Sequence, residues 1–275
     1  MPRNELHSVL RSATTIDATL EAGVLWLLIG GDNSAGAMAR DSFAQLGDVF
    51  DALSTDDEVR VVVLKGAGNR FSTGGNVRAM AERAARDDTA ERFSHGAAIS
   101  YLKRMYRNLL AVDQPLLACV NGDAVGAGAT LALHCDIVLA AEEARFGDPH
   151  VRRGLVASAG PGIWSLMTSL NVAKEYLLTG DLMSAQEAHR LGLVNHVYPS
   201  ADLEGQASAL ARRLADGAPL AIQWTKRVLN RAASRQFVDL LQEGIAHELL
   251  TFDTLDHDEG VQSFLEHRSP IFRGI

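Results

Sequence analysis

Residues 116–128 read LLACVNGDAVGAG, an apolar run that leads into a glycine-rich turn. An earlier stretch has the same plan, because the apolar run at 61–64 is followed by the turn FSTGGN at residues 71–76. Glycine allows a positive φ and a close approach between backbone and ligand. A bend from a strand into a helix also leaves the first N–H groups of the helix unpaired. The two turns therefore predict two backbone donors that could hold one developing oxyanion.

The segments around these turns alternate between strand and helix patterns. Short apolar runs predict buried strands, and apolar residues at helical spacing predict helices. The predicted strands are 24–29, 59–64, 116–120 and 137–141, and the predicted helices are 38–53, 99–112 and 127–134. Such alternation is typical of α/β architecture. After Tyr198-Pro199 only helical patterns follow, at 203–214, 220–232, 237–250 and 260–267.

Charge and composition exclude several classes of protein. The net charge is −8 and the isoelectric point is about 5.6, which argues against nucleic acid or an anionic membrane as a partner. The N-terminus has no apolar stretch typical of a signal peptide, and no run is long enough to span a membrane. The only two cysteines, Cys119 and Cys135, lie in apolar runs and are expected to be reduced. We expect a cytoplasmic protein without a bound metal.

Two longer strings carry a resemblance. Residues 65–80, KGAGNRFSTGGNVRAM, and 121–149, NGDAVGAGATLALHCDIVLAAEEARFGDP, resemble the enoyl-CoA hydratase/isomerase family, also called the crotonase superfamily. The stretches at 176–197 and 264–268 extend the resemblance. It implies an α/β fold, a spiral of ββα units with a C-terminal helical region. On this basis we predict an acyl-CoA-binding core over residues 1–200 and an oligomerisation region over 201–275, assembled as a homotrimer or a dimer of trimers.

The resemblance also implies a site. The family binds acyl-CoA thioesters, needs no cofactor beyond the coenzyme A of its substrate, and stabilises a thioester enolate with two backbone N–H groups. By position these donors are the amides of Gly75 and Ala127. Further positions that the resemblance assigns to substrate or coenzyme A are Phe71, Thr73, Gly74, Asn76, Arg78, Gly126, Phe264 and His267.

The sequence departs from the family at its two catalytic glutamates. Thr130 and His150 occupy those positions. His150 is the best remaining acid/base candidate because imidazole exchanges protons near neutral pH. Asp148 could orient His150 or act itself, and Thr130 could position a water or line the pocket. We predict a chemistry like that of enoyl-CoA hydratases and isomerases. The alternatives are hydrolysis, decarboxylation or C–C cleavage of a CoA thioester, or acyl-CoA binding without catalysis.

Overall fold

The computed structural model describes residues 5–30, 36–38, 40–77, 80–81 and 89–275, with the backbone alone described over 89–98. Its centre is a six-stranded sheet in the order β1-β2-β4-β6-β8-β11. Only β1 is antiparallel to its neighbour. The strands are β1 (Ile16–Glu21), β2 (Val24–Ile29), β4 (Val61–Gly66), β6 (Leu116–Val120), β8 (Ile137–Ala141) and β11 (His196–Tyr198). Every residue of β6 is buried, as expected for a parallel strand covered on both faces.

Two small sheets stand beside the large one. The first runs β10 (Leu182–Ser184), β9 (Arg145–Gly147) and β7 (Ala124–Val125), and the second pairs β3 (Ala37–Met38) with β5 (Gly74–Gly75). A parallel bridge between Ser72 and Ala124 joins the two. This bridge brings the two glycine turns side by side.

Three successive segments have the same ββα plan. Each takes one strand from the large sheet, one from a small sheet and then a helix: β2, β3 and α2 (Arg40–Leu53); β4, β5 and α4 (Thr89–Ala111); β6, β7 and α5 (Ala127–Leu133). The repeated plan confirms the expected spiral of ββα units. The remaining described helices before the C-terminal region are α1 (Glu5–Ser12), η2 (His150–Arg153), α6 (Gly160–Met167), α7 (Leu170–Thr179) and α8 (Ala185–Arg190).

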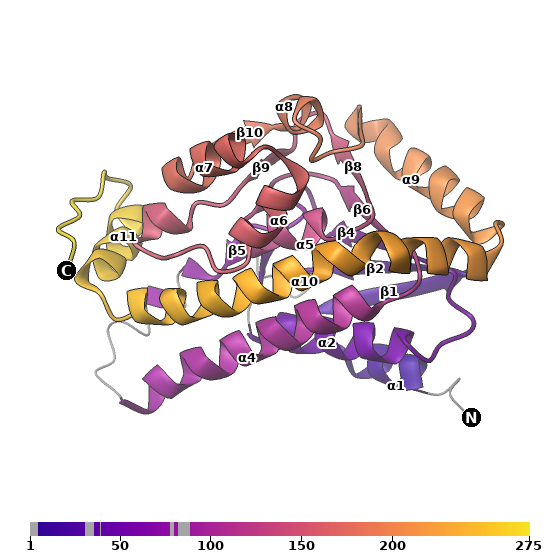
Figure 1. Ribbon diagram of the computed structural model, residues 1–275, viewed down its shortest axis with the longest axis horizontal. Helices are drawn as coiled ribbons and strands as arrows, with labels where there is room; N and C mark the ends of the chain where they lie inside the picture. The colour runs from indigo at the N-terminus through magenta and orange to yellow at the C-terminus, as the bar shows by residue number, and fades with distance from the viewer. Residues whose placement is uncertain (1–4, 31–35, 39, 78–79, 82–88) are drawn as a thin grey trace.

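The C-terminal region is helical, with α9 (Ser200–Ala215), α10 (Pro219–Thr251) and α11 (Leu255–Leu265). The prediction of two helices over 220–232 and 237–250 was wrong, because α10 is one helix of 33 residues. The linking residues 233–236 read ASRQ and contain no glycine or proline that would end a helix. Figure 1 shows α10 crossing the molecule beside α4, and it also packs on α6.

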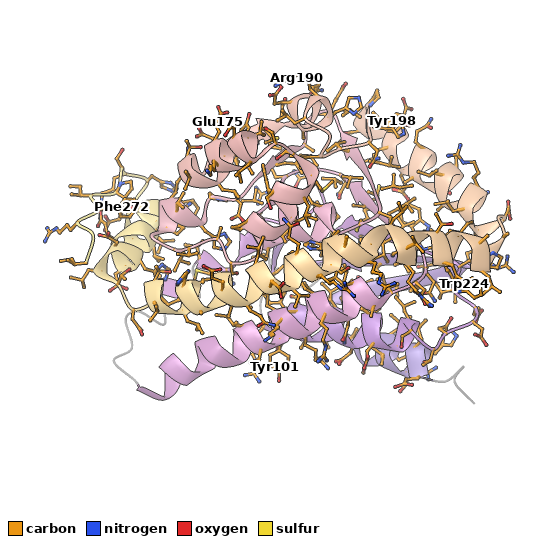
Figure 2. All side chains as sticks on the ribbon, in the orientation of Figure 1. Tyr101, Glu175, Arg190, Tyr198, Trp224 and Phe272 are labelled. Atoms are coloured by element: carbon orange, nitrogen blue, oxygen red, sulfur yellow. The ribbon has the colours of Figure 1, made fainter. Side chains whose placement is uncertain are left out.

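The outer face of α10 is apolar near its start. Leu220, Trp224 and Val228 recur every four residues and are exposed, and Trp224 is labelled in Figure 2. An exposed apolar stripe of this kind often marks a contact with another chain. The role of residues 201–275 in oligomerisation stays a prediction. Among the helices of the described residues, none combines the length and the apolar character that a membrane span requires.

Candidate active site

The two glycine turns meet at a cavity of about 130 Å³. Gly75 and Asn76 reach it from the first turn, and Ala127 reaches it from the second. Ala127 is the first residue of α5, so its N–H has no acceptor within the helix. Gly126 precedes it with φ of 57° and donates its own N–H to Gly147 O at 2.8 Å. The structure thus brings together the residues predicted to supply the two backbone donors.

Asp148 and His150 line the same cavity. Asp148 follows β9 and is 1% exposed, and Pro149 then leads into the 3₁₀ helix η2, which begins at His150. The Asp148 carboxylate contacts Nδ1 of His150. Burial alone would lower the pKa of His150, but the Asp148 charge and hydrogen bond, with a smaller contribution from Glu248, raise it to about 9. The imidazole is therefore a cation at neutral pH and a possible proton donor.

Glu248 is a further carboxylate in the cavity, and it was not among the residues predicted for the site. Its Oε1 lies 3.7 Å from His150 Nε2, and the residue is 6% exposed. Burial raises the pKa of Glu248 above its ordinary value, against smaller opposing effects from His150 and the Ser158 hydroxyl. Within the described part of the chain, no group of three or more His, Cys, Asp and Glu side chains is placed to hold a metal ion. Asp148, His150 and Glu248 are thus three titratable side chains that line one cavity.

A signal for Glu248 was present in the sequence. The buried positions in the second half of α10 include Phe237, Leu241 and Glu248, which are spaced by four and seven residues and so share one helix face. A glutamate on the apolar face of a helix is unusual because burial of its charge is costly. This position identifies Glu248 as a buried carboxylate, although it does not reveal which residue lies opposite.

Thr130 is buried at 1% exposure and lines the cavity. Its hydroxyl interacts with that of Tyr106, whose pKa is raised mainly by burial, so the phenol stays neutral. Neither hydroxyl is a base at neutral pH. Both can donate or accept a hydrogen bond in the cavity.

Other residues predicted for the site lie elsewhere. The residues described as lining the cavity do not include Phe71, whose side chain is fully buried in the core, so its contact with a substrate stays a prediction. The residues described as lining the cavity do not include Thr73, whose N–H donates to Gly36 O at 2.9 Å. Gly74 packs against the second turn through its backbone. Arg78 falls outside the described residues.

Phe264 and His267 line a separate hollow of about 590 Å³. Arg153 covers the Phe264 ring, with its guanidinium carbon 3.9 Å from the ring centroid. The helix η2 connects the two places, since His150 lies at the cavity and Arg152 and Arg153 lie at this hollow. Within one chain, therefore, the structure does not place Phe264 or His267 at the cavity.

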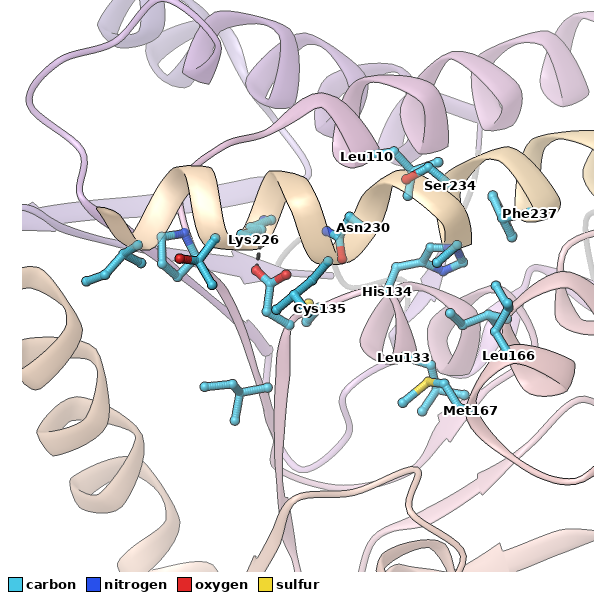
Figure 3. Close-up of a pocket in the computed structure, with 18 of the residues that line it drawn as sticks. Leu110, Leu133, His134, Cys135, Leu166, Met167, Lys226, Asn230, Ser234 and Phe237 are labelled. Carbon is cyan, nitrogen blue, oxygen red and sulfur yellow. Dashed lines mark ion pairs between the residues drawn. The ribbon is translucent and has the colours of Figure 1, made fainter. Parts of the chain in front are cut away.

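A larger pocket, of about 670 Å³, contains none of the residues predicted for catalysis. Figure 3 shows it between α10 and the end of α5, with Lys226 paired to Asp136 at 2.8 Å. His134 lines it, and burial lowers the pKa of this histidine to about 4, so the ring is neutral. Burial also raises the pKa of the Cys119 thiol to about 12, and it raises that of Cys135. Neither thiol is an activated nucleophile.

The spiral of ββα units and the cavity between its glycine turns define an enzyme of the crotonase fold class. The sequence model described as "Enoyl-CoA hydratase/isomerase" matches residues 20–274, and the chain belongs to this family. It is 34% identical over 260 residues to the 2,3-dehydroadipyl-CoA hydratase of Escherichia coli (strain K12), covering 91% of this chain and 95% of that protein. It is 35% identical over 244 residues to the carnitinyl-CoA dehydratase of Salmonella agona, covering 86% of this chain and 89% of that protein.

Solved structures agree with the sequence relatives. A crystal structure of an enoyl-CoA hydratase/isomerase from Mycobacterium paratuberculosis superposes with a TM-score of 0.83 at 35% identity, over 91% of this chain and 98% of that chain. An enoyl-CoA hydratase from Mycobacterium avium subsp. paratuberculosis gives a TM-score of 0.84 at 28% identity, over 95% and 99% of the two chains. The protein is therefore an enzyme of the hydratase/isomerase family.

Proposed function

We propose that this enzyme acts on α,β-unsaturated acyl-CoA thioesters and stabilises a thioester enolate with the amides of Gly75 and Ala127. His150, held by Asp148, moves the proton at Cα. The observation that carries the proposal is that Gly75, Ala127 and His150 line one cavity. The family membership of the chain supports a CoA thioester as the substrate.

The oxyanion part rests on the two turns. An enolate oxygen carries charge that the thioester carbonyl lacks, so donors placed at that oxygen stabilise the transition state more than the substrate. Ala127 begins a helix, and its amide is not used by the helix ladder. One such donor is typically worth about 3 kcal/mol of barrier stabilisation.

The proton-transfer part rests on His150. Thr130 and His150 stand where the family places its two glutamates, and a threonine hydroxyl is not a base at neutral pH. The Asp148 carboxylate keeps His150 protonated, in the form that can give a proton to Cα of the enolate. Thr130 and Tyr106 then position the acyl group or a water.

For the coenzyme A tail, we propose that Phe264 and His267 contact the nucleotide. The support is the aromatic ring and guanidinium pair of Phe264 and Arg153 in a surface hollow. We also propose assembly into homotrimers or dimers of trimers through the C-terminal helices, for which the exposed Leu220, Trp224 and Val228 are the support.

The test uses crotonyl-CoA in D₂O. Loss of the conjugated absorbance should accompany formation of 3-hydroxybutyryl-CoA with deuterium at Cα. His150→Gln should reduce the rate at least about 100-fold, the usual effect of losing a general acid or base. His247→Gln, at an exposed histidine on α10, is the control and should leave the rate unchanged.

The proposal fails if no enoyl-CoA is turned over and no Cα–H of a saturated acyl-CoA exchanges. A panel that adds 3-oxoacyl-CoA and malonyl-CoA separates the reaction classes. If 3-oxoacyl-CoA or malonyl-CoA is turned over and no enoyl-CoA is hydrated, stabilisation of an enolate would remain supported, but hydration would be excluded as the reaction. Full activity of His150→Gln would remove His150 as the proton carrier.

A further inference from the structure

We infer that Glu248, supplied by α10, is a second catalytic residue of the cavity and takes a proton from the water that adds to Cβ. This inference rests on the proposed function and adds to it a residue from a part of the chain that the family resemblance did not assign to catalysis. It also explains how hydration can proceed in a chain with threonine and histidine at the positions of the two usual glutamates.

The geometry of Glu248 points to a ligand in the cavity. The side chain lines the cavity, and Oε1 is 3.7 Å from His150 Nε2. Oε2 is buried and has no hydrogen-bond partner among the residues that the structure describes. A buried carboxylate oxygen without a donor is costly, so a water or a substrate hydroxyl in the cavity would stabilise it.

A purely structural role fits Glu248 less well, as a comparison with Lys226 on the same helix shows. Lys226 is also buried, but its ammonium is paired with Asp136 at 2.8 Å and donates to Gln114 O at 2.8 Å. Buried structural charges are normally saturated in this way. Glu248 instead leaves one oxygen for the contents of the cavity.

The step needs two groups in opposite protonation states. The Glu248 carboxylate accepts a proton from water as the water oxygen forms its bond to Cβ. The π pair of the Cα=Cβ bond becomes the C1=Cα bond of the enolate, and the π pair of the thioester carbonyl moves onto its oxygen. The enolate then takes the proton of the His150 imidazolium at Cα. The enzyme is left with a neutral histidine and a protonated glutamate. A proton passing from Glu248 to His150 restores the starting state, so the net change is the addition of one water.

The charges around the pair suit this assignment. Asp148 contacts His150 from the other side and favours its cation. Arg153 opposes that cation more weakly from η2, and His150 in turn helps to lower the pKa of His257 on α11. His150 is therefore the proton donor and Glu248 the proton acceptor at the start of hydration.

Glu248→Gln tests the inference, because glutamine keeps the size of the side chain and removes its basicity. Hydration of crotonyl-CoA should fall at least about 100-fold. Exchange of the Cα–H of butyryl-CoA in D₂O, measured above pH 9 where His150 is neutral and can take the proton, should stay within about threefold of the wild type. Glu243→Gln, at an exposed glutamate of α10, is the matched control and should hydrate normally.

Glu248→Asp keeps a carboxylate at a shorter reach and should recover part of the hydration lost in the glutamine variant. Hydration by Glu248→Gln within about threefold of the wild type would overturn the inference. A parallel loss of hydration and exchange in both variants would also overturn it, since that result indicates a structural role. Failure of the proposed function looks different, because the wild type itself would then neither hydrate crotonyl-CoA nor exchange the Cα–H of butyryl-CoA.

Discussion

Gly74 and Gly126 lie where the two glycine turns are in close backbone contact. A Cβ built on Gly74 would lie 2.7 Å from Val125 O and 3.6 Å from Gly126 Cα, and one built on Gly126 would lie 3.8 Å from Gly74 Cα. Both residues have positive φ, 80° and 57° respectively. The next residues along the chain, Gly75 and Ala127, are the proposed oxyanion donors. The spacing between the donors therefore depends on the absence of side chains just before them.

Gly74→Ala should lower activity more than it lowers stability. Alanine at a positive φ costs roughly 1 kcal/mol by itself. The new methyl group would also meet a backbone oxygen at 2.7 Å, and backbone cannot move aside as a side chain can. The turns must separate, so we expect kcat for crotonyl-CoA to fall at least about tenfold, in line with the loss of part of one donor. Steady-state kinetics and thermal unfolding measure the two effects.

Gly68→Ala provides the control for backbone strain. Gly68 has φ of 67°, and a Cβ there meets nothing within 4 Å. The variant should lose a similar roughly 1 kcal/mol from the strain alone and keep its kcat. Equal kinetics for the two alanine variants would show that the contact between the turns does not govern catalysis.

Stability should depend on pH through His150. Its pKa in the folded protein is about 9, above the ordinary value of 6.5. A raised pKa stabilises the fold below pH 6.5, and that contribution is lost as the pH rises through about 9. The free energy of unfolding of the wild type minus that of His150→Gln should therefore decrease over this window, by up to about 3 kcal/mol. Urea titrations at several pH values measure it.

His247→Gln, in which an exposed histidine is lost from α10, is the control for the substitution and should change the free energy of unfolding by no more than about 0.5 kcal/mol. A difference for His150→Gln that stayed flat over the window would show that Asp148 does not hold the imidazole as a cation.

The rate of hydration should also depend on pH through the pKa of His150. Since the protonated imidazole is the proposed donor to Cα, kcat/KM should hold up to about pH 9 and fall above it. Asp148→Asn removes the charge that raises the pKa of His150, while Glu248 still raises this pKa and Arg153 still lowers it. The alkaline limb should therefore move to lower pH in this variant. An unmoved limb, with a reduced rate at every pH, would contradict the assignment to His150.

The sequence predicted the turns better than the buried charges. Glycines at 74, 75 and 126, each in a turn that follows an apolar run, indicated backbone that needs positive φ or close approach. That requirement is local, so it can be read along the chain. Asp148 and His150 are two residues apart, and their contact was likewise anticipated. The family resemblance supplied the order of the ββα units.

The contacts that could not be predicted are those between distant segments. The helix pattern around Phe237 and Leu241 indicates that position 248 faces inward, but nothing local says that it faces His150. Phe71 shows the converse. It lies inside a glycine turn, yet its side chain packs into the core, because the direction of a side chain in a turn depends on the sheets behind it. The continuity of α10 could have been predicted only from the absence of glycine and proline between residues 232 and 237, because nothing there would end a helix.

Gly160→Ala should lower activity by displacing the Asp148 carboxylate. Gly160 is the first residue of α6, and a Cβ there would lie 2.3 Å from Asp148 Oδ2 and 3.2 Å from Leu177 Cδ2. Alanine favours helix by about 1 kcal/mol over glycine, so α6 itself should tolerate the change. Asp148 must shift and its contact with His150 is lost, so hydration should fall about tenfold or more and the alkaline limb should move to lower pH.

Gly205→Ala is the paired control for helix propensity. Gly205 lies in α9, and a Cβ there meets nothing within 4 Å. This variant should gain up to about 1 kcal/mol of stability at unchanged kcat. If Gly160→Ala behaved in the same way, with higher stability and full activity, Asp148 would have room to move without consequence. The carboxylate would then not be the group that positions and charges His150.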